Sequence, residues 1–232
     1  MRSLTFIHFC KLSRRRQILT EKQLARILGG SDNSRYGLVK RAMQAGDLVK
    51  IKRGQYVLAD RHRKYPVHPF RLAQALVVGS YVSMESALAF HGWIPEAVFA
   101  TVSVTPGRKS IDISHTVFGK FAFRPLALNK TGFLEGVERQ TISNQTVLVA
   151  KPLRALFDLI ALKKHKWQGM GWISSGMRID PEYLLRTPRK DFHALRRVYK
   201  HKAVLEFLNH LEQHVVALKA QKNTKKDEGL LK

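Results

Sequence analysis

The chain begins with apolar residues at helical spacing. They predict a first helix, in loose register, from Leu4, Ile7, Phe9, Leu12, Ile18 and Leu19. Thr20 and Gln23 then have the Thr-x-x-Gln form of a capping box, which indicates the start of a second, short helix. Gly29 and Gly30 end that helix, because glycine readily adopts the left-handed conformation found at helix ends.

A third helix is expected next, with Ser31 or Asp32 as its cap and Gly46 after its end. Its predicted apolar stripe is Tyr36, Val39 and Met43. The opposite, polar face carries residues spaced by 4, 3, 1 and 3, namely Asn33, Gly37, Lys40, Arg41 and Gln44.

Residues 47–58 have the pattern of a β-hairpin, with Arg53-Gly54 at the turn. Leu48, Ile51, Tyr56 and Leu58 are expected on its buried face. Three helices and a basic hairpin within about 60 residues predict a winged helix-turn-helix.

The expected use of this unit is DNA binding. Side chains of the third helix would reach base edges in the major groove, and those of the hairpin would hold the backbone phosphates. The candidate residues are Ser34, Arg35, Lys40, Arg41 and Gln44 on the helix, and Lys50, Lys52, Arg53 and Gln55 on the hairpin. Arg14, Arg15 and Arg16 are a charge run that could add phosphate contacts. A winged helix that serves only as a protein-interaction module remains an alternative.

The rest of the chain predicts a mixed α/β domain that ends in amphipathic helices, so the fold class is α+β. Helices are expected at about 70–78, 83–92 and from 153, and strands at 98–105, 111–117, 120–125 and 145–150. The expected divisions are a DNA-binding domain at 1–62, an α+β domain at 63–219 and a charged flexible tail at 220–232.

The net charge of +24 points to a polyanionic partner. Residues 1–65 carry +12, residues 66–150 carry +2 and residues 151–232 carry +10, so two basic ends flank a nearly neutral middle. No apolar stretch is long enough to cross a bilayer and no signal peptide is expected, which favours nucleic acid over membrane as the partner. The lone cysteine, Cys10, excludes a disulfide scaffold, and a cytoplasmic setting is expected.

A helix from about Arg189 repeats the spacing 4, 3, 1 and 3 in Arg189, His193, Arg196, Arg197 and Lys200. Arg189, Arg196, Arg197 and Lys200 are therefore candidates for additional phosphate contacts. A solvated helix surface is the alternative interpretation. The last helix carries Val204, Phe207, Leu208, Leu211, Val215 and Leu218, and should dock on its own domain or in a partner's groove.

No catalytic motif accompanies these patterns, so an enzyme, a metal site and a cofactor are not expected. His210 and His214 have metal-ligand spacing but no third ligand is evident. Glu85, His91 and Glu96 lie close in sequence and are interpreted as capping, internal hydrogen-bonding or partner-binding residues. A nuclease without a recognisable acidic array stays open.

Several stretches resemble one known family. Gly79–Glu96, with the sequence Gly-Ser-Tyr-Val-Ser-Met-Glu-Ser-Ala-Leu-Ala-Phe-His-Gly-Trp-Ile-Pro-Glu, resembles the signature stretch of the AbiEi antitoxins. Val102–Arg108 resembles the strand that follows it, and Arg53–Leu58 the wing that precedes it. Lys151–Leu159 is similar to the family's Pro-Glu-Lys-Ala-Leu-Leu-Asp-Leu helix, with Leu153-Arg154 in place of Glu-Lys. The match covers roughly residues 15–165.

This resemblance implies an antitoxin of a type IV toxin–antitoxin system of bacteria and phage-defence islands. Its winged helix would repress its own operon by occluding the promoter, and its C-terminal domain would antagonise a nucleotidyltransferase-like toxin, by direct contact or indirectly. The implied partners are double-stranded DNA of its own promoter region and that toxin. Two alternatives remain open: a toxin-neutralising module without specific DNA binding, and a sequence-independent nucleic-acid-binding accessory protein of a mobile element. The sequence leaves the oligomeric state undefined.

Overall fold

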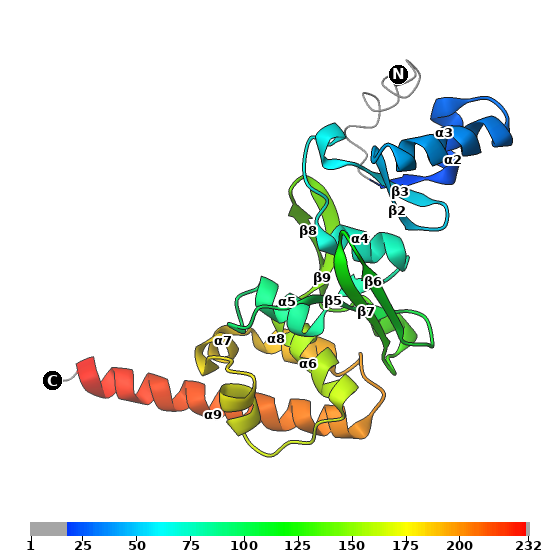
Figure 1. Cartoon of the computed structure of the whole chain (residues 1–232). Coiled ribbons are helices and arrows are strands. Elements are labelled where there is room, and N and C mark those ends of the chain that lie inside the picture. The colour runs from blue at the N-terminus through cyan, green and yellow to red at the C-terminus, as the bar shows by residue number, and fades with distance from the viewer. Residues whose placement is uncertain (1–17, 231–232) are drawn as a thin grey trace. The chain divides into compact units, whose positions relative to one another are not determined.

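The protein is described here by a computed structural model that covers residues 18–230. Its architecture is α+β: N-terminal helices with a small antiparallel sheet come first, then a six-stranded mixed sheet and C-terminal helices (Figure 1). Two compact units make up the chain. The first holds the described residues up to Val78 together with Thr141–Thr146, and the second holds the remainder.

The first unit builds two helices on a three-stranded sheet of order β1-β3-β2, antiparallel throughout. Its elements are β1 (Ile18–Thr20), α2 (Glu21–Leu28), α3 (Asp32–Gln44), β2 (Leu48–Lys52) and β3 (Gln55–Leu58). The predicted β-hairpin is confirmed as β2 and β3, which pair Leu48 with Leu58 and Lys50 with Tyr56.

The prediction that Ile18 and Leu19 continue a first helix is wrong. They form β1, in which Ile18 pairs with Val57 and Leu19 with Tyr56. An extended backbone is forced here because Thr20 caps α2, and a cap residue lies outside the helix that it begins. The other residues of that predicted helix, with Arg14, Arg15 and Arg16, lie outside the described residues.

Both helix starts follow the capping chemistry of the sequence. The Thr20 hydroxyl accepts from the Gln23 backbone N–H at 3.3 Å, and the Gln23 side-chain oxygen accepts from the Thr20 N–H at 2.9 Å. This reciprocal pair is the predicted capping box. Ser31 caps α3 by accepting from the Ser34 N–H at 3.3 Å, and the φ of +72° at the hairpin turn explains Gly54.

The core of the first unit corrects the predicted stripe of α3. Val39 is buried and Met43 half-buried, but Tyr36 is 71% exposed. The buried line on α3 runs through Val39 and Ala42, and Tyr36 lies to the side of it, with Lys40. The core cluster consists of Leu19, Leu24, Val39, Ala42, Leu48 and Leu58.

A 3₁₀ turn, η1 (Asp60–His62), and α4 (Pro69–Leu76) complete the first unit. The stretch from Arg61 is more than a linker, because Arg61 and His62 both bond to the buried carboxylate of Asp47. His68 caps α4 through its ring Nδ1, which accepts from the Phe70 N–H at 3.2 Å. Gln145 donates to the Pro66 carbonyl at 2.9 Å and accepts from the His68 N–H, which joins Thr141–Thr146 to this unit.

The six-stranded sheet has the order β6-β7-β5-β4-β9-β8. Pairs β4–β9 and β5–β7 are parallel, whereas β4–β5 and β6–β7 are antiparallel. The strands are β4 (Tyr81–Val82), β5 (Ala100–Thr105), β6 (Ile111–His115), β7 (Gly119–Pro125), β8 (Val137–Ile142) and β9 (Gln145–Ala150). The hairpin β6–β7 and strands β5 and β9 were predicted. The strands β4 and β8 were missed, because β4 has two residues and β8 is largely polar.

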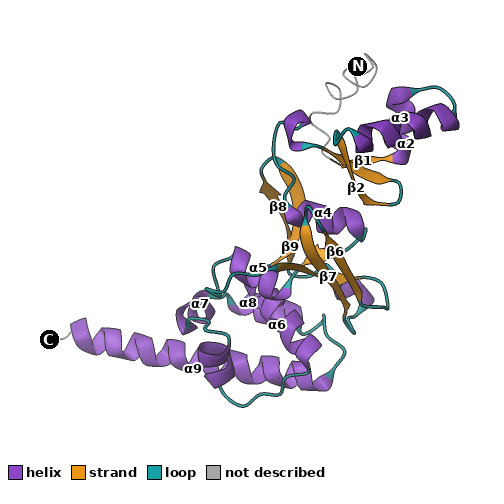
Figure 2. Ribbon diagram, viewed as in Figure 1, coloured by secondary structure: helices purple, strands orange, loops and turns teal. Residues whose placement is uncertain are grey.

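Helices of the second unit pack around α6, which is buried over most of its surface (Figure 2). Such all-round burial explains why six of the eight residues of Leu153–Ile160 are apolar, the exceptions being Arg154 and Asp158. The helical elements are α5 (Met84–Phe90), η2 (Lys130–Gly132), α6 (Pro152–Lys163), the π-helical turn η3 (Trp172–Gly176), α7 (Pro181–Arg186), α8 (Arg189–Leu195) and α9 (Lys202–Leu230).

The structure differs from the predicted C-terminal helices in two places. Helix α8 ends at Leu195, so the predicted helical stripe from Arg189 to Lys200 is wrong beyond that residue. Helix α9 includes residues 220–230, which were expected to be a tail. Among the described residues, none of the helices has the length and apolar character that crossing a membrane requires.

Candidate functional site

The face of α3 that points away from the core of the first unit carries polar and basic side chains. Lys40, Arg41 and Gln44 are all exposed, and neither Lys40 nor Arg41 has an ion-pair partner among the described residues. Gly37 lies one turn before Lys40 and Arg41 on α3, and a Cβ built at Gly37 would come within 3.3 Å of the Arg41 Nη1 atom. The absence of a side chain at Gly37 therefore gives the Arg41 guanidinium room to lie along the helix.

Tyr36 belongs to the same face and was missed as a candidate. Its ring is 71% exposed on the side of α3 that carries Lys40. The sequence signal was misleading, because a tyrosine between polar residues at helical spacing is normally part of the core. An exposed aromatic ring beside cations can contact a sugar or a base as well as form a hydrogen bond through its hydroxyl group.

Two other predicted residues of α3 lie away from this face. Ser34 is exposed in the first turn, where its N–H takes part in the Ser31 cap. Arg35 lies on the core side and is partly buried. Its guanidinium pairs with Asp32 and donates to the carbonyls of Gly29 and Gly30, so it stabilises the start of the helix.

The β2–β3 hairpin places its cations in two environments. Lys50 and Arg53 are exposed, whereas the Lys52 ammonium donates to the Leu76 carbonyl at 2.7 Å and is part-buried. Gln55 is half-buried at the start of β3, and its side-chain oxygen is buried without a hydrogen-bond partner in the described part of the chain. Lys50 and Arg53 are thus the exposed cations of the hairpin. We call Tyr36, Gly37, Lys40, Arg41, Gln44, Lys50 and Arg53 the basic face of the first unit.

The second unit contains a buried polar cluster around Asp158, which has no exposed surface. One carboxylate oxygen accepts from Arg154 Nε at 2.9 Å and from the Tyr199 hydroxyl at 2.8 Å. The other accepts from the Ser83 hydroxyl at 2.7 Å and from the Tyr81 hydroxyl at 3.0 Å. All four donors converge on one carboxylate, so its burial is fully compensated.

The pKa values of this cluster follow from its burial. Burial raises the pKa of both Tyr81 and Tyr199, and the negative charge of Asp158 raises them further. Burial on its own would lower the pKa of Arg154, but the Asp158 carboxylate more than offsets this effect and the net shift is upward. The cluster therefore keeps a charged arginine and two neutral phenols near neutral pH.

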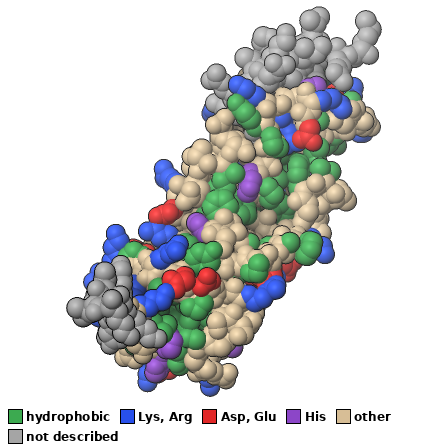
Figure 3. Space-filling view, turned by 90° about the vertical axis from the view of Figure 1, so that its left-hand side faces the viewer, with side chains coloured by type: hydrophobic (Ala, Val, Ile, Leu, Met, Phe, Trp, Pro, Cys, Tyr) green, Lys and Arg blue, Asp and Glu red, His purple; other side chains and the backbone are tan. Residues whose placement is uncertain are grey.

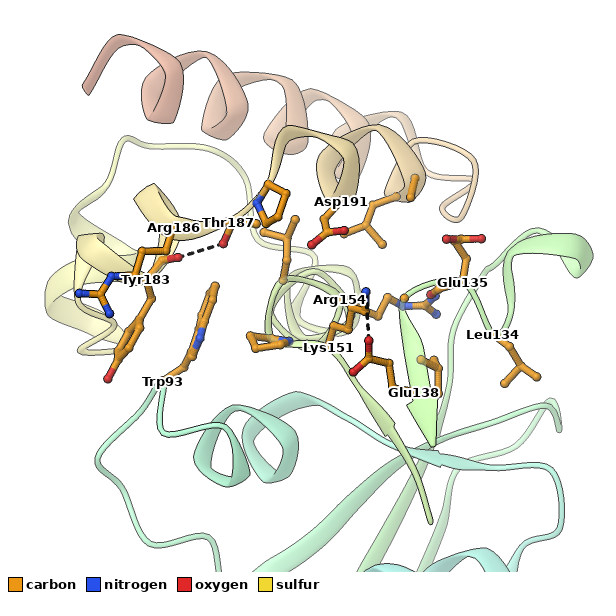
Figure 4. A pocket seen from close by; sticks show the side chains of 17 residues that line it. Trp93, Leu134, Glu135, Glu138, Lys151, Arg154, Tyr183, Arg186, Thr187 and Asp191 are labelled. Carbon is orange, nitrogen blue, oxygen red and sulfur yellow. Dashed lines mark hydrogen bonds and ion pairs between the residues drawn. The ribbon is translucent and has the colours of Figure 1, made fainter. Parts of the chain in front are cut away.

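A pocket of about 510 Å³ lies on the second unit, with Arg154 in its wall (Figure 4). Trp93 and Tyr183 stack at one end, with ring centroids 5.7 Å apart, and Leu134 and Glu135 lie at the other. Lys151 pairs with Glu138 at 3.1 Å within the pocket, and this hydrogen bond raises the pKa of Lys151. Aromatic, apolar and charged walls of this kind suit an organic ligand or a protein side chain.

The basic residues around α8 gather on one carboxylate of α9. The side chain of Glu212 is 6% exposed and accepts from Arg189 Nε at 3.0 Å. His193 Nε2 lies 3.3 Å from the same oxygen, and Arg196 Nη2 is 2.5 Å from the other oxygen. Arg189, His193 and Arg196 of the predicted stripe thus all contact one acidic group, with which the sequence pattern did not pair them.

The remaining polar candidates of the second unit lie in separate contacts. Glu85 pairs with Lys163, Glu96 with Arg178, and His91 donates to the Ala150 carbonyl at 2.9 Å. His91 thus forms an internal hydrogen bond, whereas Glu85 and Glu96 form partly exposed ion pairs. His210 and His214 lie beside the Trp167 ring, and within residues 18–230 no three His, Cys, Asp or Glu side chains are grouped as a metal site would require.

Comparisons with known proteins leave the family open. Neither a scan against protein-family models nor a search of curated proteins finds a match to this chain.

Proposed function

We propose that this protein is a DNA-binding antitoxin that represses its own toxin–antitoxin operon and antagonises a nucleotidyltransferase-like toxin. The observation that carries the proposal is the basic face of the first unit, where Lys40, Arg41 and Gln44 are exposed side by side on one helix. In this proposal the first unit is a winged helix-turn-helix, α3 is its recognition helix and the β2–β3 hairpin is its wing.

The geometry of the first unit supports this assignment in two respects. Helix α3 is 13 residues long and is capped at its start, so it is a rigid element that can enter a major groove. The hairpin follows it directly and brings Lys50 and Arg53, which can neutralise phosphates. Arg35 and Lys52 have partners within the chain, so the proposal assigns them a supporting role and relies chiefly on Lys40 and Arg41.

The antitoxin part of the proposal derives from the resemblance of Gly79–Glu96 and Lys151–Leu159 to the AbiEi antitoxins. These two stretches are far apart in the sequence, yet both contribute to the buried cluster around Asp158. Tyr81 and Ser83 come from the first stretch, and Arg154 and Asp158 from the second. The residues that carry the resemblance therefore support one another in a single structural unit.

A fluorescence-anisotropy titration tests the DNA-binding part. The full chain is titrated against its own upstream DNA and a scrambled duplex at two or more salt concentrations, because affinity without salt cannot be interpreted. We expect a specificity ratio of roughly 10³ or more. Arg41→Ala should reduce this ratio, whereas Arg108→Ala, which removes an exposed arginine of the second unit, should leave it unchanged. A ratio near one with a steep salt dependence would instead indicate sequence-independent binding.

A second experiment separates the two activities. The double variant Lys40→Ala/Arg41→Ala should lose repression of a reporter placed behind its own promoter. It should still rescue growth when the neighbouring toxin gene is expressed, because the antitoxin activity is assigned to the second unit. Loss of both activities in a variant that remains folded would contradict this division of roles.

A further inference from the structure

The second unit has its own concentration of positive charge, outside the basic face of the first unit. A hollow of about 670 Å³ is lined by Lys190, His193, Arg196 and Arg197, with the η2 turn at Thr131 and Gly132 as its opposite wall. Glu135 contributes one carboxylate to the lining. Three permanent cations therefore face one anion, and the hollow has an excess of positive charge.

The backbone that carries Arg197 is fixed by the neighbouring turn. The Asn129 side chain donates to the Arg197 carbonyl at 2.8 Å, and the Asn129 N–H donates to the Val198 carbonyl at 2.8 Å. Gly132 packs so closely that a Cβ would lie 2.9 Å from the Val198 Cα atom. A side chain at position 132 would separate the two walls, so this glycine and Asn129 define the shape of the hollow.

Glu212 fixes the other arginine. It pairs with the Arg196 guanidinium, which lines the hollow, and also with Arg189 and His193. Two arginines around one carboxylate leave an uncompensated positive charge, which an incoming anion can neutralise. Lys190 and Arg197 have no ion-pair partner in the described part of the chain, so their donors are available.

We propose that this hollow binds a phosphate group of a nucleic-acid backbone or of a free nucleotide, with Lys190 and Arg197 as the direct donors and Arg196 positioned beside them by Glu212. The chemistry is that of a phosphate site, in which an arginine fork and an ammonium group surround an oxyanion. A concave site of this size admits a phosphate with its attached sugar. This proposal stands independently of DNA binding by the first unit, because every residue in it belongs to the second unit.

The test uses the full chain with Lys40→Ala/Arg41→Ala as the background, so that binding by the basic face is reduced. The probe is a fluorescein-labelled single-stranded oligonucleotide, titrated at several salt concentrations. Adding Lys190→Ala/Arg197→Ala should weaken binding and lower the slope of log affinity against log salt by about one for each phosphate contact that is lost. The matched control is Arg108→Ala/Lys109→Ala, which removes the same charge from an exposed turn of the same unit.

The outcomes separate a site from a general charge effect. A loss that is larger in Lys190→Ala/Arg197→Ala than in the control supports the hollow. Equal losses in the two double variants, or no loss in either, overturn it. Where the loss is specific, competition by pyrophosphate or by a mononucleotide identifies a site for free phosphate groups, and failure to compete identifies the nucleic-acid backbone as the source. Either way, the response of the first unit to its own upstream DNA is unaffected, so the two proposals fail separately.

Discussion

Two stretches of this chain have the same spacing of polar or basic residues but adopt different structures. Asn33 to Gln44 and Arg189 to Lys200 both place polar or basic residues at steps of 4, 3, 1 and 3. In the first unit the pattern lies on the uninterrupted helix α3. In the second unit α8 ends at Leu195, and the last three positions lie on a turn and a short extended segment.

The surroundings of the two stretches differ as much as their backbones. Lys40 and Arg41 face solvent without an acidic partner among the described residues, whereas Arg189 and Arg196 share the carboxylate of Glu212. On the face drawn in Figure 3, Lys and Arg side chains lie beside Asp and Glu side chains in the lower part of the molecule. Periodicity therefore indicates which residues can share a face, and the tertiary partner determines whether their charge remains available.

The largest difference between a buried and an exposed charge is expected at Asp158. Asp158→Ala should destabilise the protein by about 3–5 kcal/mol, because it leaves the Arg154 guanidinium buried without its counter-charge. Urea denaturation of the full chain measures the loss. Asp112→Ala is the matched control, since Asp112 pairs with Arg124 at the surface and its removal should cost less than about 1 kcal/mol. Equal losses from the two variants would show that the Asp158 cluster does not carry the stability assigned to it.

A smaller loss is expected at the carboxylate behind α8. Glu212→Gln should cost about 1–2 kcal/mol, because Glu212 is buried but its partners Arg189, His193 and Arg196 are partly exposed to solvent. Lys40→Ala/Arg41→Ala should stay within about 0.5 kcal/mol of the parent protein, because these exposed side chains have no ion-pair partner among residues 18–230. Thermal and urea denaturation compare the two variants. A larger loss of stability in Lys40→Ala/Arg41→Ala than in Glu212→Gln would contradict the proposed difference between the two stretches.

The predictable parts of this structure are the local ones. The capping box at Thr20, the cap at Ser31 and the turn at Gly54 depend on residues within a few positions of one another, and each was predicted from its sequence signature. The predictions failed where residues far apart in the sequence determine the local structure or the burial of a side chain. Ile18 pairs with Val57 in a sheet, and Tyr36 is exposed because Val39 and Ala42 fill the core.

The candidate sites follow the same division. Exposure of Lys40, Arg41 and Gln44 was predictable from helical spacing. The contacts of Lys52 with Leu76 and of Arg196 with Glu212 join residues 24 and 16 positions apart, and no sequence pattern connects them. The buried Arg154 was also beyond prediction, because a charged residue in an apolar helix gives no indication of the aspartate and two phenols that surround it.

A substitution at Gly37 tests whether the face of α3 is shaped for close approach. Gly37→Ala should stabilise the protein by about 0.5–1 kcal/mol, because alanine has the higher helix propensity and the new Cβ displaces only the flexible end of Arg41. DNA binding should nevertheless weaken, because the Cβ occupies the middle of the basic face. Denaturation and anisotropy titrations measure the two effects. Gly171→Ala is the control, since a Cβ there meets nothing within 4 Å. Unchanged DNA affinity in Gly37→Ala would place the DNA contact elsewhere.

The smallest effect is a pH dependence that involves one histidine in each unit. Burial lowers the pKa of His68 and of His91 below 6.5, and for His91 the hydrogen bond to Ala150 offsets part of this shift. Because the folded-state pKa lies below the unfolded value, the neutral rings stabilise the fold above about pH 6.5, and this contribution is lost as the pH falls through the lowered folded-state pKa. In His68 the reason is direct, since protonation of Nδ1 removes the acceptor that caps α4.

Urea midpoints measured between neutral and mildly acidic pH should therefore fall more steeply for the parent protein than for His68→Asn/His91→Gln. The asparagine retains a side-chain acceptor for the cap and the glutamine retains a donor toward the Ala150 carbonyl, so the variant loses the titration and keeps the contacts. His201→Asn, at an exposed position, should keep the slope of the parent. Identical slopes in the parent and the double variant would mean that other groups, chiefly carboxylates, set the acid stability of both units.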